Sequence, residues 1–147
     1  MTPRLEAQRI VAKYGTRDPF TLADYMDVPV LTVDPSASID GAFVRDSGWC
    51  YIGLREGLSP PHKRMGLAHE LGHLVCHTGI NYFFVLEHTF FPPGRYERQA
   101  NEFAAEYLIP DDALSIHSDI RLIAAELDVP VELFRYKRPP RGGLICM

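Results

Sequence analysis

Residues 66–79, GLAHELGHLVCHTG, carry three histidines at intervals of four, His69, His73 and His77, with Glu70 directly after the first. Residues four apart on a helix lie on one face, about one turn above each other. The imidazoles of His69 and His73 can therefore bind one Zn²⁺ ion, with metal–nitrogen distances of about 2 Å. The spacing predicts two metal ligands on one helix and leaves open which residue completes the site.

Signals at both ends support a helix around this motif. Ser59 precedes two prolines, which is typical of a helix start, and Gly79 is a typical stop, so a helix of about five turns is predicted between them. Most other positions near the motif are apolar, among them Leu67, Leu71 and Val75. Polar residues on such a buried face need a partner, and a metal ion would be one.

Glu70 is the candidate general base. It lies one residue round the helix from His69, poorly placed to bind the same ion but well placed to reach a water molecule bound to it. Zinc lowers the pKa of its water towards about 7 and polarises a carbonyl group. A carboxylate beside it can accept the proton and pass it to a leaving amine. We therefore expect peptide hydrolysis with Glu70 as the base.

Helix geometry excludes His77 as a third ligand of the same ion. It lies eight residues from His69, which is about 12 Å along the axis at a rise of about 1.5 Å per residue. The metzincin pattern also fails, because Cys76 stands where that pattern needs a glycine and no histidine follows three residues later. We expect His77 to be a polar residue near the helix end and Cys76 to pack in the core.

A second helix, predicted over residues 95–109, offers the third ligand. Glu97 and Asn101 lie four apart on one face of it, so Glu97 could bind the metal while Asn101 orients a ligand histidine through a hydrogen bond. The alternative is a solvated Glu97 paired with a neighbouring arginine. Ala100 and Ala104 lie near the same face and favour the inward orientation.

Composition indicates one globular domain. The chain has 147 residues, of which 46% are hydrophobic, and this length suits a single core. A formal net charge of −4 gives no basic field that would attract nucleic acid. There is neither a secretory signal nor a run of about 18 apolar residues, and the three scattered cysteines do not form a disulfide framework. We expect a cytoplasmic protein that binds neither membranes nor nucleic acid directly.

The remaining pattern predicts an α+β fold in which a small antiparallel sheet packs on helices. Further helices are predicted at 3–14, 20–26 and 120–127, and strands at 28–33, 41–45 and 49–54. The last two strands flank Asp46-Ser47-Gly48, which is typical of a hairpin turn. We expect a single domain over residues 1–138 and a flexible C-terminal tail over residues 139–147.

Two motifs together resemble one family. HELGH, beginning at His69, and ERQANEFAAEYLIP, beginning at Glu97, are similar to the ImmA/IrrE metallopeptidase signature, HExxH followed by ExxANxFAxxLLxP. The resemblance implies a zincin-like core of the gluzincin type, with His69, His73 and Glu97 as zinc ligands and Glu70 as the catalytic base. Mn²⁺ also tolerates this ligand set. The implied substrate is a helix-turn-helix repressor of a mobile element, prophage or stress response.

A different class of function stays open, namely a non-catalytic anti-repressor or antitoxin-type binding module with a structural metal. Structural zinc is normally enclosed by four Cys or His ligands, so three ligands beside Glu70 favour the enzyme. The phenylalanine-rich connector at 80–95 is expected to be core or a wall of the peptide cleft. The strand at 49–54 is expected to offer an edge to the substrate backbone. The late segment at 118–137 favours packing or repressor docking over reading DNA.

Overall fold

The computed structural model describes residues 2–34, 40–77, 84–86, 94–114 and 119–139. Most of the aromatic connector at 80–95, and residues 140–147 of the expected tail, lie outside the described residues. Helix α1 spans Pro3–Tyr14, α2 Pro19–Tyr25, α3 Pro60–Cys76, α4 Arg95–Leu108 and α5 Ile120–Leu127, and two short 3₁₀ helices are η1 (Asp111–Leu114) and η2 (Val131–Tyr136). None of the described helices combines the length and apolar character required to cross a membrane.

Capping side chains begin four of these helices. Thr2, Asp18, Ser59 and Asp119 each accept a hydrogen bond from a backbone N–H in the first turn of the helix that follows. Such a bond satisfies a donor that has no partner within the helix. Helices α1 and α5 begin at the predicted residues, Ser59 marks the start of α3 as predicted, and α2 begins at Pro19, one residue before the predicted start. Helix α3 ends at Cys76, three residues before the predicted glycine stop, and His77 is its C-cap.

The sheet is mixed rather than purely antiparallel. Its strands are β1 (Val30–Val33), β2 (Gly41–Asp46), β3 (Trp49–Arg55) and β4 (Phe84–Leu86), in the order β1-β3-β2-β4. Strand β2 pairs antiparallel with β3 and β4, whereas β1 pairs parallel with β3. The α+β class is therefore confirmed. The expectation that the strand at 49–54 offers an edge to substrate is wrong, because β3 lies between β1 and β2.

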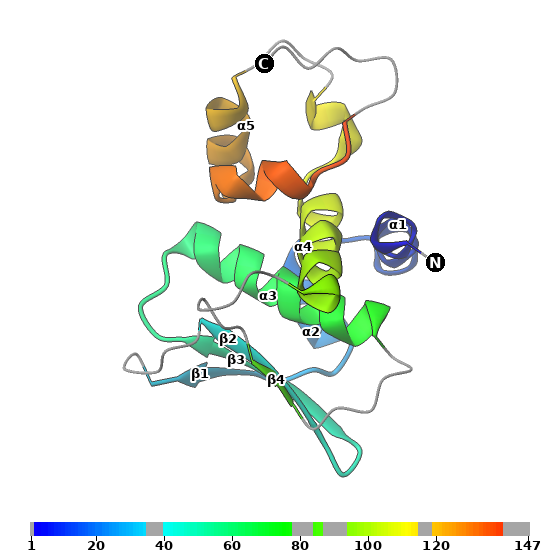
Figure 1. Ribbon diagram of the computed structural model, residues 1–147, viewed down its shortest axis with the longest axis vertical. Coiled ribbons are helices and arrows are strands. Elements are labelled where there is room, and N and C mark those ends of the chain that lie inside the picture. The colour runs from blue at the N-terminus through cyan, green and yellow to red at the C-terminus, as the bar shows by residue number, and fades with distance from the viewer. Residues whose placement is uncertain (1, 35–39, 78–83, 87–93, 115–118, 140–147) are drawn as a thin grey trace.

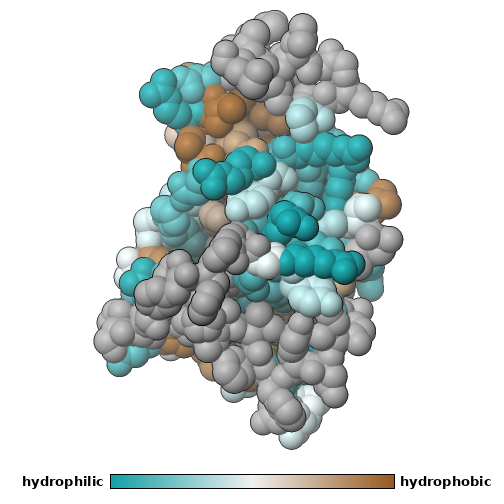
Figure 2. Space-filling model, in the orientation of Figure 1, coloured by the Kyte–Doolittle hydropathy of each residue, from teal (hydrophilic) through white to brown (hydrophobic). Residues whose placement is uncertain are grey.

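Helix α3 lies between the sheet and α4, as Figure 1 shows, with α1 and α2 alongside and α5 at the end of the molecule farthest from the sheet. The core is shared by the helices and the sheet; its fully buried members include Leu22, Ile52, Leu67, Leu71, Phe103 and Tyr107. At the α5 end, apolar side chains reach the surface (Figure 2), where Ile120, Leu122 and Val131 are exposed. The architecture places α3 and α4 face to face in the middle of the protein.

Gly72 allows these two helices to approach closely. A Cβ atom added there would lie 3.1 Å from the carbonyl oxygen of Ala100 and 3.1 Å from Cβ of Phe103. Both neighbours belong to α4, and both residues are fully buried, so neither can move aside easily. Glycine inside a helix costs about 1 kcal/mol relative to alanine. The backbone contact between the helices therefore requires a residue that the helix alone would disfavour.

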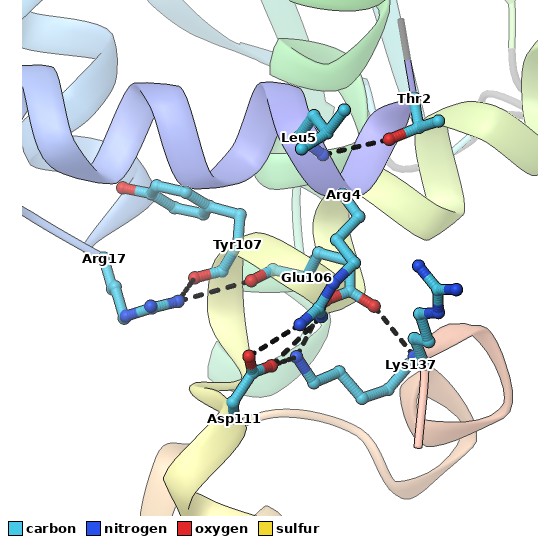
Figure 3. A network of polar contacts seen from close by, with 9 residues as sticks. Thr2, Arg4, Leu5, Arg17, Glu106, Tyr107, Asp111 and Lys137 are labelled. Atoms are coloured by element: carbon cyan, nitrogen blue, oxygen red, sulfur yellow. Dashed lines mark hydrogen bonds and ion pairs between the residues drawn. The ribbon is translucent and has the colours of Figure 1, made fainter. Parts of the chain in front are cut away.

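A network of charges ties both ends of the described chain to α4 (Figure 3). Arg4 of α1 contacts Glu106 at 2.6 Å and Asp111 at 2.7 Å. Lys137, which follows η2, contacts the same two carboxylates at 2.8 and 2.6 Å. The backbone N–H of Arg138 also donates to Glu106 at 2.8 Å. Hydrogen bonds from Arg4 and Lys137 hold the pKa of Asp111 well below its usual range. The network thus fixes α1, η1 and η2 against the end of α4.

Gly72→Ala should weaken the contact between α3 and α4. Overpacking a core typically costs about 1–3 kcal/mol, which exceeds the roughly 1 kcal/mol gained in helix propensity. We expect a lower free energy of unfolding, by up to about 2 kcal/mol, measured by urea denaturation. Gly66→Ala on the same helix is the control, because its added Cβ would meet only Leu54 Cδ2 at 3.5 Å. Equal stability changes in the two variants would contradict the packing argument.

Asp111→Asn should reduce the acid sensitivity of the fold. The folded-state pKa of Asp111 lies below the unfolded value of about 3.9. Its contribution to stability is therefore complete above that value and is lost as the pH falls through the folded-state pKa. We expect the variant to melt a few degrees lower at pH 7 and to lose less stability between about pH 4 and pH 2. Asp24→Asn, an exposed carboxylate of α2, is the control, and identical pH profiles for wild type and Asp111→Asn would refute the assignment.

Candidate metal centre and catalytic carboxylate

His69, His73 and Glu97 converge where α3 faces α4. His69 Nε2 lies 3.1 Å from Glu97 Oε2, and His73 Nε2 lies 2.8 Å from Glu97 Oε1. One donor atom from each residue falls within 4.8 Å of the others. The two imidazole side chains are 7% and 2% exposed, whereas the carboxylate is 24% exposed. Two nitrogens and one carboxylate oxygen therefore face a common point, and Glu97 is the most exposed of the three donors.

This donor set fits a divalent ion. Zinc in hydrolytic sites accepts three protein ligands, two His and one Glu among the known combinations, and keeps a fourth position open. The rings of His69 and His73 lie at 80° to each other with centroids 4.9 Å apart, so their nitrogens approach the common point from different directions. Within the described part of the chain, these are the residues whose arrangement could hold a metal ion.

Asn101 contacts the far nitrogen of His69. Its Oδ1 lies 2.7 Å from His69 Nδ1, and this carbonyl oxygen can only accept a hydrogen bond. With a metal bound, the proton of His69 would therefore reside on Nδ1, and the lone pair of Nε2 would face the common point. A hydrogen bond of this kind orients a metal-binding histidine and selects its tautomer. Asn101 is thus positioned as the sequence analysis expects of an orienting residue.

Glu70 lies on α3 outside the group of three donors. It is 1% exposed and sits against the start of β2, where a Cβ atom added to Gly41 would lie 3.2 Å from Glu70 Oε2. A side chain at residue 41 would therefore crowd the carboxylate. Sequence reasoning found Glu70 but missed Gly41, because nothing in the local sequence pairs position 41 with α3.

A cleft of about 350 Å³ opens beside Glu70 and His69. Its walls combine apolar residues with acidic ones; they include Leu58, Met65, Asp40 and Glu132. Glu132, from η2, accepts a hydrogen bond from the ring Nε2 of His62 at 3.0 Å, and this contact joins η2 to the first turn of α3. The carboxylate of Glu70 therefore borders a space that a peptide segment can enter.

His77 is neither a member of the donor group nor an exposed polar residue. It is 5% exposed, and its Nδ1 lies 3.0 Å from His73 Nδ1. Its Nε2 lies 2.9 Å from Gln99 Oε1. Burial lowers the pKa of His77, which favours the neutral ring. This contact was not predicted from the sequence, although the spacing of four from His73 could have indicated it.

Cys76 packs in the core as the sequence predicts. Burial is the main reason that its thiol has a pKa raised to about 12, so the sulfur stays protonated at neutral pH. A nucleophile would need the thiolate, and Cys76 is not among the residues grouped as possible metal ligands in the described part of the chain. Cys76 therefore contributes packing beside the site and not a fourth ligand.

Comparisons with known proteins agree over most of the chain. The family model described as IrrE N-terminal-like domain matches residues 23–138. The Uncharacterized immunity region protein 2 of Bacillus phage phi105 is 34% identical over 134 residues, which cover 88% of this chain and 85% of that protein. Metallopeptidase ImmA of Bacillus subtilis (strain 168) is 27% identical over 112 residues, which cover 75% of this chain but only 64% of that protein.

Glu97→Ala should remove one of the three candidate ligands. We expect the zinc dissociation constant, measured by chelator competition, to rise more than about 100-fold, beyond the 10–100-fold that loss of an outer partner costs. Glu102→Ala is the matched control on α4, because Glu102 is 38% exposed and contacts Arg98 at 3.9 Å. Unchanged zinc binding in Glu97→Ala would remove Glu97 from the ligand set.

Proposed function

Because this chain belongs to the IrrE N-terminal-like family of metallopeptidases, we propose that it is a zinc-dependent endopeptidase that cleaves a helix-turn-helix repressor. The resemblance of its two signature motifs to the ImmA/IrrE family predicted this membership. The observation that carries the proposal is the convergence of His69, His73 and Glu97 beside the buried Glu70, at a cleft. Mn²⁺ is the alternative metal for the same ligands.

The role proposed for each residue follows from the position of its side chain. His69, His73 and Glu97 would hold a divalent ion, which would supply the Lewis acidity that polarises a carbonyl group and acidifies water. Glu70, outside that donor group, accepts the proton of the attacking water and delivers it to the leaving amine. Asn101 keeps the Nε2 lone pair of His69 directed at the ion. Each role is assigned to a group whose surroundings suit it.

The sheet supports binding of an extended substrate. Among the described strands, β4 is at one edge of the sheet, and its Leu86 pairs with Ala42, the neighbour of Gly41 beside Glu70. An extended peptide can add to such an edge through backbone hydrogen bonds. We propose that the substrate backbone lies along β4, with side chains entering the cleft between Met65 and the acidic residues Asp40 and Glu132.

The names of the relatives support the substrate class. One relative is named as an immunity region protein of a phage, and the other as a metallopeptidase. A repressor of a mobile element or prophage is a protein substrate that fits both names and the signature motifs. Exposed Ile120, Leu122 and Val131 provide an apolar surface at which such a protein can dock. Cleavage of a repressor places the enzyme in the cytoplasm.

One catalytic domain over residues 1–138 is part of the proposal. The family match begins at residue 23, but Ala7 and Ile10 of α1 are buried in the same core as α3 and α4. Arg4 and Lys137 share two carboxylate partners, so the first helix and the residues after η2 close on the same point. These contacts support a single cooperative unit.

Glu70→Gln tests the activity. We expect the variant to bind zinc like the wild type and to cleave a helix-turn-helix repressor that the wild type cuts at least about 100-fold more slowly, because a general base contributes 10²–10⁴-fold. The measurement is mass spectrometry of the repressor after incubation with zinc-loaded protein, with and without chelator. Glu102→Gln is the control.

The alternative function, a non-catalytic binding module, predicts a different result for Glu70→Gln. If Glu70→Gln retains zinc and relieves repression fully while the repressor stays intact, the protein is a non-catalytic anti-repressor or antitoxin-type module with a structural metal. If the wild type cuts the repressor, chelator stops the cutting and Glu70→Gln leaves the repressor whole, the peptidase is supported.

A further inference from the structure

His77 connects a candidate metal ligand to the neighbouring helix. As the C-cap of α3, its backbone N–H donates to the His73 carbonyl at 3.1 Å. Its side chain lies between His73 and Gln99, 3.0 Å from the one and 2.9 Å from the other. The ring of Tyr96 packs edge-on against it, with centroids 4.7 Å apart. His77 is therefore held from three sides in one orientation.

When His73 binds a metal, the side chains of His73, His77 and Gln99 can form a hydrogen-bonded chain in a single direction. A neutral imidazole carries one N–H, and the nitrogen that binds the metal must have a bare lone pair. His73 Nε2 faces the metal point, so its proton resides on Nδ1 and is donated to His77 Nδ1. The proton of His77 then resides on Nε2 and is donated to Gln99 Oε1.

Gln99 is a suitable end for this chain because its carbonyl oxygen accepts and cannot donate. With the opposite amide orientation, the NH₂ group would donate to His77 Nε2 and move the proton of His77 to Nδ1. That proton would point at His73 Nδ1 and drive the proton of His73 onto Nε2, where it blocks the metal. The side chain at residue 99 therefore selects the tautomer of His73 from two hydrogen bonds away.

Amide side chains of α4 would then set the tautomers of both candidate histidine ligands. Asn101 acts on His69 directly, and Gln99 acts on His73 through His77. Glu97, on the same helix, supplies the carboxylate. Residues 97, 99 and 101 lie within about one helical turn. One short segment of α4 thus contributes a ligand and both orienting groups.

We propose that His77 and Gln99 are positioning residues that hold His73 in the tautomer that binds the metal. This inference rests on the proposed metal centre of His69, His73 and Glu97, and it adds to that centre a two-step relay that reaches α4. Loss of a hydrogen-bonding partner behind a metal ligand typically weakens metal binding 10–100-fold.

Zinc affinity of matched variants tests the relay. His77→Leu removes the acceptor and should raise the zinc dissociation constant about 10–100-fold in chelator competition. His77→Asn places Oδ1 near the position of Nδ1 and should restore affinity to within about 3-fold of the wild type, because an acceptor is regained. His62→Asn, an exposed histidine in the first turn of α3, is the control. The thermal midpoints of the metal-free variants report packing separately.

Gln99 provides the directional test. Gln99→Lys offers only donors, so it should force the wrong tautomer and bind zinc more weakly than Gln99→Leu, which merely removes the acceptor. In the zinc-loaded wild type, ¹⁵N NMR of the histidine rings should show the proton of His77 on Nε2 and that of His73 on Nδ1.

The outcomes separate this proposal from the proposed function. Wild-type zinc affinity in His77→Leu, or a proton on Nδ1 of His77, overturns the relay and leaves the metal centre intact. Suppose that His77→Leu binds zinc weakly, that His77→Asn does not restore the affinity, and that both metal-free variants melt at a lower temperature than the wild type. His77 then has a packing role, and the relay is also overturned. Absence of zinc binding in the wild type overturns both proposals together.

Discussion

Close contact between the backbones of α3 and α4 at Gly72 sets the geometry of the candidate site. His69 and His73 flank this glycine on α3, and a side chain at position 72 would collide with Ala100 and Phe103 of α4. A displacement of either helix would change the distance from both imidazoles to Glu97, since packed interiors transmit such shifts. A glycine in the middle of α3 disfavours the helix, but it allows the candidate ligands of two helices to come together.

The interface between α3 and α4 both stabilises the fold and orients the candidate metal ligands. The apolar stripe of α4, including Ala100, Phe103 and Ala104, is fully buried, while the adjoining residues Glu97 and Asn101 face the histidines of α3. Burial of the stripe fixes the rotation of the helix about its axis. The same rotation determines where the polar residues of α4 point.

Local signals allowed much of this architecture to be predicted. Capping residues such as Thr2 and Asp119 mark helix starts through bonds made within one turn, and the i, i+4 spacing of His69 and His73 depends on helix geometry alone. The pattern of residues 95–109 made Glu97 a candidate ligand with a solvated alternative, and the family signature supported the ligand role; its distance from the histidines depends on tertiary packing. The parallel pairing of β1 with β3, the strand β4, and the proximity of Gly41 to Glu70 depend on contacts between distant segments. The contacts of His77 were not predicted, because helix geometry excluded it as a ligand and Gln99 belongs to another helix.

The unequal exposure of the three donors determines how an ion would enter and leave. Both imidazoles are almost fully covered, at 7% and 2%, whereas a quarter of the Glu97 side chain is open to solvent, at 24%. Of the three donors, the carboxylate is the one that can swing on its flexible stem while the rings stay fixed. The exchange rate of the ion would follow the motion of this one side chain, whereas the equilibrium affinity would depend on all three. The protein could thus load and lose its metal at a rate set independently of how tightly it is held.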